Sequence, residues 1–307
     1  MSKALITGSE GFVGKYLRAE LEGAGYEVTG LDRVSGPGCR QCDLLDAEGL
    51  ANVLREIRPD AIFHLAGQAN VWKSWKMPAE TMEINAVGTI RLLEAVRNEC
   101  PEAAVLLVGS SDQYGFLGER GVNVTEDMET RPQSPYAISK RAQEEMGMLY
   151  AKSYGMRVIA TRSFNHGGAG QGEGFMIPDF AAGIARVEAG QQKCLRVGNL
   201  EAKRDFTHVK DVVRAYRLLC EKGQGGTVYN VGSGQTHVVR DVLEKLIAMA
   251  EKPVPVEQDP ARMRPSDTPE IKCDNTRLKR DTGWTPEYSM DDILRDTLEW
   301  YRKKIRE

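Results

Sequence analysis

Tyr136 and Lys140 lie four residues apart in a segment whose composition predicts the start of a helix. Ser134 is a preferred N-cap, and Pro135 suits the first helical position. Residues four apart share one helical face, so the phenol and the ammonium can converge. A nearby cation and the positive end of a helix both favour the phenolate. The pair therefore predicts a tyrosine that exchanges a proton near neutral pH. The alternative is a half-buried tyrosine beside a solvated lysine.

A glycine-rich turn stands near the N-terminus, at Gly8, Gly11 and Gly14. It follows the apolar run 4–7 and precedes an amphipathic stretch, which predicts a strand, a tight turn and a helix. Glycines let the backbone approach a pyrophosphate, which then sits at the helix N-terminus. Asp32 follows 18 residues after Gly14, at the end of the next predicted strand. We expect it to bond an adenosine ribose.

Arg33 directly follows this acid. An arginine here can pair with the 2′-phosphate of NADP, whereas Asp32 favours NAD. The choice between the two cofactors therefore stays open, with Arg33 favouring NADP(H).

Apolar runs alternate with amphipathic stretches through the first half of the chain. The predicted strands are 4–7, 28–32, 61–65, 104–109 and 157–162, and the predicted helices are 15–25, 44–57, 79–100 and 134–154. Apolar strands separated by helices indicate a parallel sheet covered on both faces. The sequence thus predicts a doubly wound α/β fold of the Rossmann type.

The regular alternation of apolar and amphipathic stretches ends after residue 164, and a glycine-rich loop at 167–174 begins a different region. This region has predicted helices at 177–189, 211–221, 238–250 and 290–305, a strand at 228–231, and a proline-rich, charged stretch at 254–269. We expect a dinucleotide-binding domain over 1–164 with parts of about 207–235. A smaller, discontinuous α/β lobe is expected over about 165–206 and 236–307.

Composition excludes several classes of partner. The formal net charge of −3 over 307 residues gives no support to a nucleic-acid or polybasic membrane partner. The N-terminus lacks signal-peptide features and no apolar run could span a bilayer, so a cytoplasmic location is expected. The four scattered cysteines are then free thiols, whereas Cys39 and Cys42 have the Cys-x-x-Cys spacing of a redox pair, half a zinc site or two incidental cysteines. Cys39 and Cys42 have no second pair at a zinc-like distance, so no metal site is predicted.

Taken together, these residues resemble the extended short-chain dehydrogenase/reductase family over nearly the whole chain. The spacing of the three glycines is that of the family. Further landmarks occur in the family's order: Asp43-Leu44, His64-Leu65-Ala66-Gly67, Asn85, Ser110 four before Tyr114, and Arg162 to His166. The motifs and their contexts agree, which favours the catalytic interpretation of Tyr136 and Lys140.

The resemblance implies a site that transfers a hydride. In it, Lys140 bonds the nicotinamide ribose and keeps Tyr136 acidic, Ser110 holds the substrate oxygen, and Tyr136 gives or takes its proton. The implied cofactor is NADP(H) or NAD(H). The residues implied in binding it are Gly8, Gly11, Phe12, Val13, Gly14, Asp32, Arg33, Asp43, Leu44, Leu65, Ala66, Gly67, Asn85, Val108, Tyr136, Lys140 and His166.

Two later segments resemble the GDP-mannose branch of the family, which acts on GDP-linked sugars. They are residues 198–206 and 264–267, each with an arginine suited to a diphosphate. A surface ion pair is the alternative for either arginine alone. The residues implied in substrate binding are Ser111, Asp112, Asn165, Asn199, Arg204, Arg264, Ser266 and Asp267.

This branch contains a 4,6-dehydratase and a reductase that acts on its product. The dehydratase uses a glutamate two residues after its catalytic threonine, whereas this chain has Asp112 after Ser110. The aspartate is shorter by about 1.5 Å, so the resemblance favours the reductase. An epimerase, or a non-catalytic nucleotide-sugar sensor, remains an alternative. The helices at 79–100 and 134–154 correspond to those that form a four-helix bundle in dimeric relatives, so a homodimer is expected.

Overall fold

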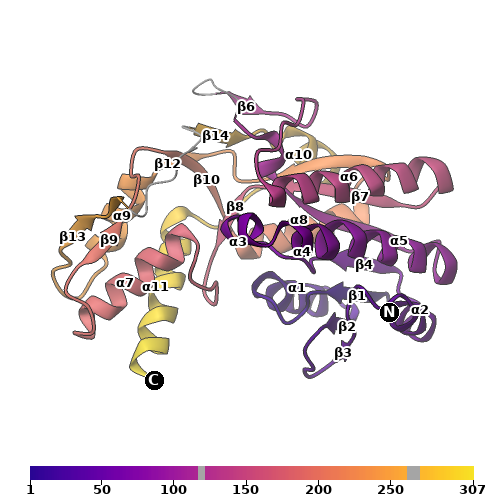
Figure 1. The fold of residues 1–307 in the computed structure, drawn as a ribbon, viewed down its shortest axis with the longest axis horizontal. Helices are drawn as coiled ribbons and strands as arrows, with labels where there is room; N and C mark the ends of the chain where they lie inside the picture. Colours follow the sequence, from indigo (N-terminus) through magenta and orange to yellow (C-terminus); the bar gives the residue numbers. More distant parts are fainter. Residues whose placement is uncertain (117–121, 261–269) are drawn as a thin grey trace.

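A parallel sheet of seven strands forms the larger part of the molecule (Figure 1). The computed structural model describes residues 1–116, 122–260 and 270–307. In spatial order the strands are β11 (Thr227–Val231), β7 (Val158–Ser163), β5 (Ala104–Ser110), β4 (Ala61–His64), β1 (Lys3–Thr7), β2 (Glu27–Asp32) and β3 (Cys39–Gln41). The predicted Rossmann-type α/β fold is confirmed, and the strand order reverses beside β1, where such sheets form a crevice.

Helices cover both faces of this sheet, because successive strand residues point to opposite sides. Ile6 faces α1 (Phe12–Gly23) and α8 (Val209–Lys222) within one buried apolar cluster. Leu5 faces α2 (Ala47–Ile57), α5 (Gly88–Glu99) and α6 (Pro135–Tyr154) within another. Both side chains are fully buried, which explains the uninterrupted apolar runs in the sequence.

The long helix predicted at 79–100 is interrupted in the structure. It consists of α4 (Pro78–Met82), a π-helical turn η1 (Glu83–Val87) and α5. A π turn inserts an extra residue into the helical repeat and is frequent at functional sites. Here it contains Asn85, one of the predicted cofactor residues.

A second lobe lies beside the sheet (Figure 1) and is built on α7 (Met176–Glu188), α9 (Val239–Ala248) and α11 (Met290–Arg306). Its five-stranded sheet contains β12 (Thr236–Val238), β10 (Lys203–His208), β14 (Glu270–Cys273), β6 (Asn123–Val124) and β8 (Asn165–Gly167). A separate pair joins β9 (Leu195–Val197) to β13 (Val256–Gln258). Two short helices, α3 (Val71–Lys76) and α10 (Thr276–Thr282), complete the described elements together with the 3₁₀ turn η2 (Ser111–Tyr114).

A buried ion pair holds the helices of the second lobe together. Arg302 of α11 donates to Glu188 of α7 at 2.7 and 2.8 Å, and also to the carbonyl of Met249 at 2.8 Å. β11 belongs to the large sheet, although the domain boundaries expected from the sequence stay a prediction. Within residues 1–116, 122–260 and 270–307, no helix is long and apolar enough to cross a membrane.

Candidate active site

Tyr136 and Ser110 meet at the carboxyl end of β5. Tyr136 is in the first turn of α6, which Ser134 caps by accepting the Ala137 N–H at 3.1 Å. Ser110 is the last residue of β5, and its side chain forms a hydrogen bond with Tyr136. Both residues are at least nine-tenths buried. The structure thus brings the predicted phenol and the predicted substrate-holding hydroxyl together.

The prediction that Tyr136 is acidic is wrong in this structure. Burial and the negative charge of Asp112 raise the pKa of Tyr136 above its ordinary value, and only the hydrogen bond with Ser110 opposes them. The phenol therefore holds its proton at neutral pH. The cation four residues away can be read from the sequence, whereas the loss of solvent around the ring depends on the tertiary structure.

Lys140 lies one turn further along α6, with its ammonium at the strand ends. Its Nζ donates to the carbonyl of Val108 at 2.8 Å and to Gln143 Oε1 at 3.0 Å. Burial lowers the pKa of Lys140 to about 8, because a desolvated ammonium is disfavoured. A Cβ added at Gly67 would lie 3.6 Å from Nζ, so the end of β4 approaches this ammonium closely.

Asn85 connects the π turn to the same place. Its Oδ1 accepts the Gln68 N–H at 2.7 Å, and its Nδ2 donates to Ser139 Oγ at 2.9 Å. A Cβ at Gly67 would lie only 2.9 Å from Asn85 Oδ1. Gly67, Asn85 and Lys140 therefore form one cluster beside Val108, as predicted for the cofactor residues.

The glycine turn fits a bound pyrophosphate. Gly8 has a φ of 75°, in the left-handed region that glycine tolerates. A Cβ at Gly14 would lie 2.4 Å from the carbonyl oxygen of Gly8, so only glycine allows this turn to close. Gly11 is the N-cap of α1 and makes no side-chain cap. The first backbone N–H groups of a helix have no partner within the helix, so this end of α1 suits an anion.

Asp32 is fixed at the end of β2, beside the glycine turn. Its two carboxylate oxygens accept the N–H of Glu10 at 3.1 Å and of Arg33 at 2.7 Å. The Arg33 side chain is exposed next to it. This arrangement suits the predicted contact with an adenosine ribose.

The remaining predicted cofactor residues lie around the same crevice. The N–H of Ala66 lies against Gly8, because a Cβ at Gly8 would be 2.8 Å from it. The Phe12 ring is parallel to the His166 ring, with centroids 6.5 Å apart. Leu44 packs against Gly88 at the start of α5. Asp43 is exposed, and its carboxylate accepts the Leu45 N–H at 2.9 Å. Leu65 and Val13 are half-buried.

The predicted substrate residues divide between the two lobes. Ser111 is buried beside Ser110, and Asp112 is exposed in the turn that follows. Asn165 lies on β8, which pairs with the strand that carries Arg204. Arg204 donates to the carbonyl of Lys203, and Asn199 accepts the Glu201 N–H at 2.9 Å. Arg264, Ser266 and Asp267 lie outside the described residues.

Sequence reasoning missed two buried residues behind Ser110, namely Gln113 and Glu144. Gln113 completes a capping box with Ser110, a pattern readable as Ser-x-x-Gln in the sequence. Glu144 lies one helical turn beyond Lys140 and faces inward. Their contact joins two separate elements, so spacing alone could not reveal it.

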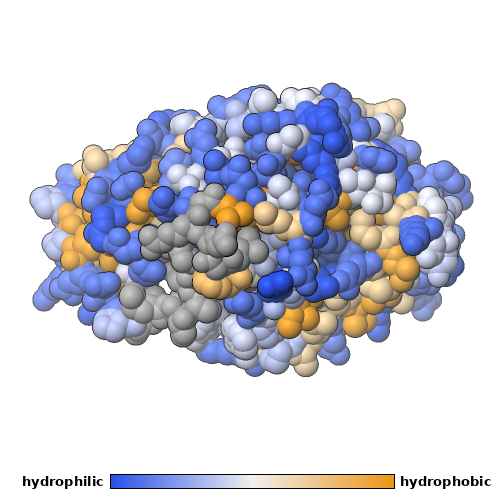
Figure 2. Space-filling view, turned by 90° about the horizontal axis from the view of Figure 1, so that it is seen from above, coloured by the Kyte–Doolittle hydropathy of each residue, from blue (hydrophilic) through white to orange (hydrophobic). Residues whose placement is uncertain are grey.

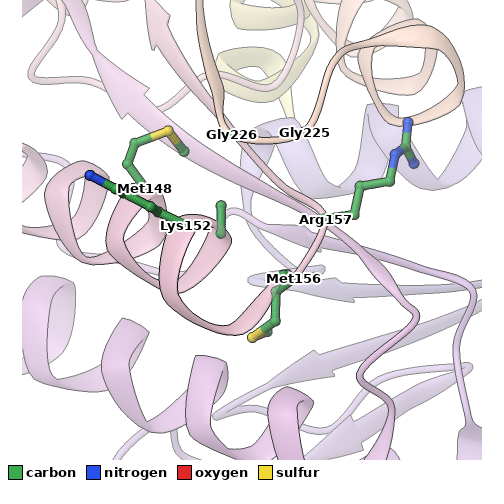
Figure 3. A pocket seen from close by; sticks show the side chains of 8 residues that line it. Met148, Lys152, Met156, Arg157, Gly225 and Gly226 are labelled. Carbon is green, nitrogen blue, oxygen red and sulfur yellow. The ribbon is translucent and has the colours of Figure 1, made fainter.

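A surface hollow of about 620 Å³ lies at the other end of α6. It is lined by Met148, Ala151, Lys152, Gly155, Met156, Arg157, Gly225 and Gly226 (Figure 3). At 1.5 Å per helical residue, it is roughly 20 Å from Tyr136 along the helix axis. The hollow is therefore not part of the site at the carboxyl ends of the strands.

Comparison with known proteins agrees with this geometry. The family model for GDP-mannose 4,6 dehydratase matches residues 5–297. The chain is 37% identical to GDP-6-deoxy-D-mannose reductase of Pseudomonas aeruginosa, covering 99% of each chain. It is 30% identical to a GDP-mannose 4,6-dehydratase of Vibrio cholerae, covering 96% of this chain and 92% of the relative.

Two solved structures extend the comparison. RMD from Pseudomonas aeruginosa, complexed with NADPH, superimposes with a TM-score of 0.90 at 35% identity, covering 99% of this chain and 100% of the other. A UDP-glucose 4-epimerase from Thermus thermophilus, complexed with NAD, superimposes with a TM-score of 0.87 at 30% identity, covering 98% and 99%.

Proposed function

Because the chain belongs to the GDP-mannose 4,6-dehydratase family, we propose that it is an NAD(P)H-dependent GDP-6-deoxy-D-mannose reductase. Its substrate would be GDP-4-keto-6-deoxy-D-mannose, reduced at C4 to GDP-D-rhamnose. The whole-length similarity to a reductase of that name supports this substrate. The structural observation that supports it is the contact of the buried Tyr136 with Ser110 at the carboxyl end of β5.

The nicotinamide cofactor, NADPH or NADH, supplies the hydride when bound. The glycine turn and the N-terminus of α1 would hold its pyrophosphate, and Asp32 its adenosine ribose. Lys140, Asn85 and Gly67 cluster where the nicotinamide ribose is expected.

Ser110 and Tyr136 act on the C4 oxygen of the sugar. Ser110 orients that oxygen with its hydroxyl, and Tyr136 donates its proton as negative charge develops there. A phenol with a raised pKa keeps its proton until a stronger base forms. That property suits reduction of a ketone, which requires a proton donor. On the nucleotide side, Arg204 on β10 is the one of the two predicted diphosphate-binding arginines that lies within the described residues.

Asp112 distinguishes this proposal from a 4,6-dehydratase, the other activity named among the relatives. A dehydratase needs an additional acid or base to eliminate water, and a shorter carboxylate reaches less far. We expect Asp112→Ala to lower kcat for the keto sugar less than about tenfold, because Tyr136 and Ser110 stay in place and Asp112 raises the pKa of Tyr136 through its charge. A dehydratase would lose most of its turnover.

The test supplies purified protein with GDP-4-keto-6-deoxymannose and either NADPH or NADH. We expect stoichiometric oxidation of the reduced cofactor and a 6-deoxy product identified by NMR. Conversion of GDP-mannose to the 4-keto sugar without added reductant would instead establish a dehydratase. Tightly retained NAD with no net oxidation would indicate an epimerase.

We also propose that the enzyme is a homodimer formed through α5 and α6. Apolar side chains are exposed on α6 at Ile138, Leu149 and Tyr154, and on the π turn that precedes α5 at Val87. In the view from above, hydrophobic surface is visible toward that end of the molecule and also at the opposite end (Figure 2). Light scattering should give twice the 34.0 kDa chain mass, and a monomer mass would contradict this.

The six unpaired cysteines support a cytoplasmic location.

A further inference from the structure

A buried ion pair lies directly behind the strand end that carries Ser110. Arg162 donates from Nε and Nη2 to the two carboxylate oxygens of Glu144, at 2.9 and 2.6 Å. Both side chains are 8% exposed. Glu144 comes from α6, and Arg162 from β7, which pairs with β5. Breaking such a pair leaves an uncompensated buried charge, so its geometry is strongly maintained.

Gln113 connects this ion pair to Ser110. Its side chain is fully buried. Its Nε2 donates to Glu144 Oε2 at 2.7 Å, and its Oε1 accepts the Ser110 N–H at 3.2 Å. A side-chain amide offers a donor and an acceptor on one planar group. The amide of Gln113 therefore links the Ser110 backbone to Glu144 and fixes the distance between them.

The backbone at Ser110 has little freedom to move independently. A Cβ at Gly109 would lie 2.3 Å from the Thr161 carbonyl oxygen and 2.8 Å from Gln113 Oε1. On the other side, Ser110 Oγ accepts the Asp112 N–H at 3.2 Å. The same hydroxyl contacts Tyr136. A shift of the Gln113 amide would therefore change the distance between the Ser110 and Tyr136 hydroxyls.

We propose that Gln113 is a positioning residue for the reduction, which acts through Ser110. This inference rests on the proposed function. The amide, anchored by Glu144, holds Ser110 Oγ where both the C4 oxygen and the Tyr136 hydroxyl reach it. Proton transfer needs these oxygens at hydrogen-bond distance, and small misplacements lower the rate.

The variant Gln113→Glu tests the hydrogen bond that the Gln113 amide donates to Glu144. It preserves the size of the side chain and the acceptor for Ser110, but places a carboxylate oxygen against Glu144. Two carboxylates in contact repel until one binds a proton. We expect kcat to fall about tenfold to a hundredfold at alkaline pH, where both carboxyls are ionised, with KM for the sugar changed less than about threefold. Activity relative to the parent should recover as pH falls, because the protonated carboxyl again donates to Glu144.

Gln192→Glu is the matched control, because it removes an amide donor, to the Cys194 carbonyl, in the other lobe. It should retain the parent kcat and pH profile. Unchanged kcat in Gln113→Glu relative to the parent across the whole pH range would overturn the proposal. So would a loss without acid recovery that is accompanied by weaker NADPH binding and a lower melting temperature, since that pattern indicates a merely structural role.

A crystal structure of Gln113→Glu provides a measurement that does not depend on the substrate. The distance between Ser110 Oγ and the Tyr136 hydroxyl should lengthen, and an unchanged distance would overturn the proposal. Failure of the parent enzyme to oxidise NADPH with the keto sugar would refute the proposed function instead. In that case the crystal structure alone decides whether Gln113 positions Ser110.

Discussion

Replacing Tyr136 with phenylalanine is expected to lower kcat for the keto sugar about 10²- to 10⁴-fold, the usual contribution of a positioned acid. Phenylalanine fills the same buried space but has no proton to donate. Binding of NADPH should change much less than kcat, because the phenol contacts Ser110 and lies away from the glycine turn. Stopped-flow measurement of cofactor oxidation, with fluorescence titration of NADPH, separates these two effects.

Tyr150→Phe is the matched control for this substitution. Tyr150 is a buried tyrosine on the same helix, and its hydroxyl donates to Glu94, away from the strand ends. Its loss should cost about 1 kcal/mol of stability and leave kcat unchanged. If Tyr136→Phe retained the parent turnover, Tyr136 could not be the proton donor.

Replacing Gly14 with alanine should weaken NADPH binding about tenfold to a hundredfold. The added Cβ would lie 2.4 Å from the Gly8 carbonyl oxygen and 2.6 Å from that of Ser9. Both are backbone atoms, so the turn itself must shift. Overpacking of this kind costs roughly 1–3 kcal/mol, and each 1.4 kcal/mol or so is tenfold in affinity. Isothermal titration with NADPH measures the change.

Gly23→Ala provides the control on the same helix, because nothing lies within 4 Å of the added Cβ. It should leave NADPH affinity unchanged and raise stability by about 0.5–1 kcal/mol, since alanine favours the helix. Equal NADPH affinity in Gly14→Ala and the parent would mean that the turn does not hold the pyrophosphate.

The centre of the large sheet could be predicted from sequence because its central strands bury both faces. The runs at β1, β4, β5 and β7 are therefore mostly apolar, and the turn after β1 contains the glycines that its geometry requires. The edge strand β3 is largely exposed and was not predicted. The strands of the second lobe were mostly missed. β8, β9 and β12 have three residues each, too few for a periodic pattern.

The protonation behaviour of the site residues was harder to predict than which residues form the site. Spacing located Tyr136 and Lys140 correctly on one helix, but the pKa of Tyr136 depends on burial by elements far away in the chain. The π turn at Asn85 reads as ordinary helix in the sequence. The contact between Gln113 and Glu144 joins residues 31 positions apart. Neither the capping-box pattern at Ser110 nor the helical pattern of α6 reveals such a contact.

The pairing of β6 with β14 has a consequence for folding during synthesis. Val124 lies opposite Cys273 in this ladder, so β6 cannot form its strand pairing until β14 has left the ribosome. α7 likewise buries its apolar face against α11, which is synthesised more than a hundred residues later. Contacts so distant in sequence form slowly and leave apolar surface exposed meanwhile. We therefore expect the second lobe to complete its packing only after α11 has been synthesised.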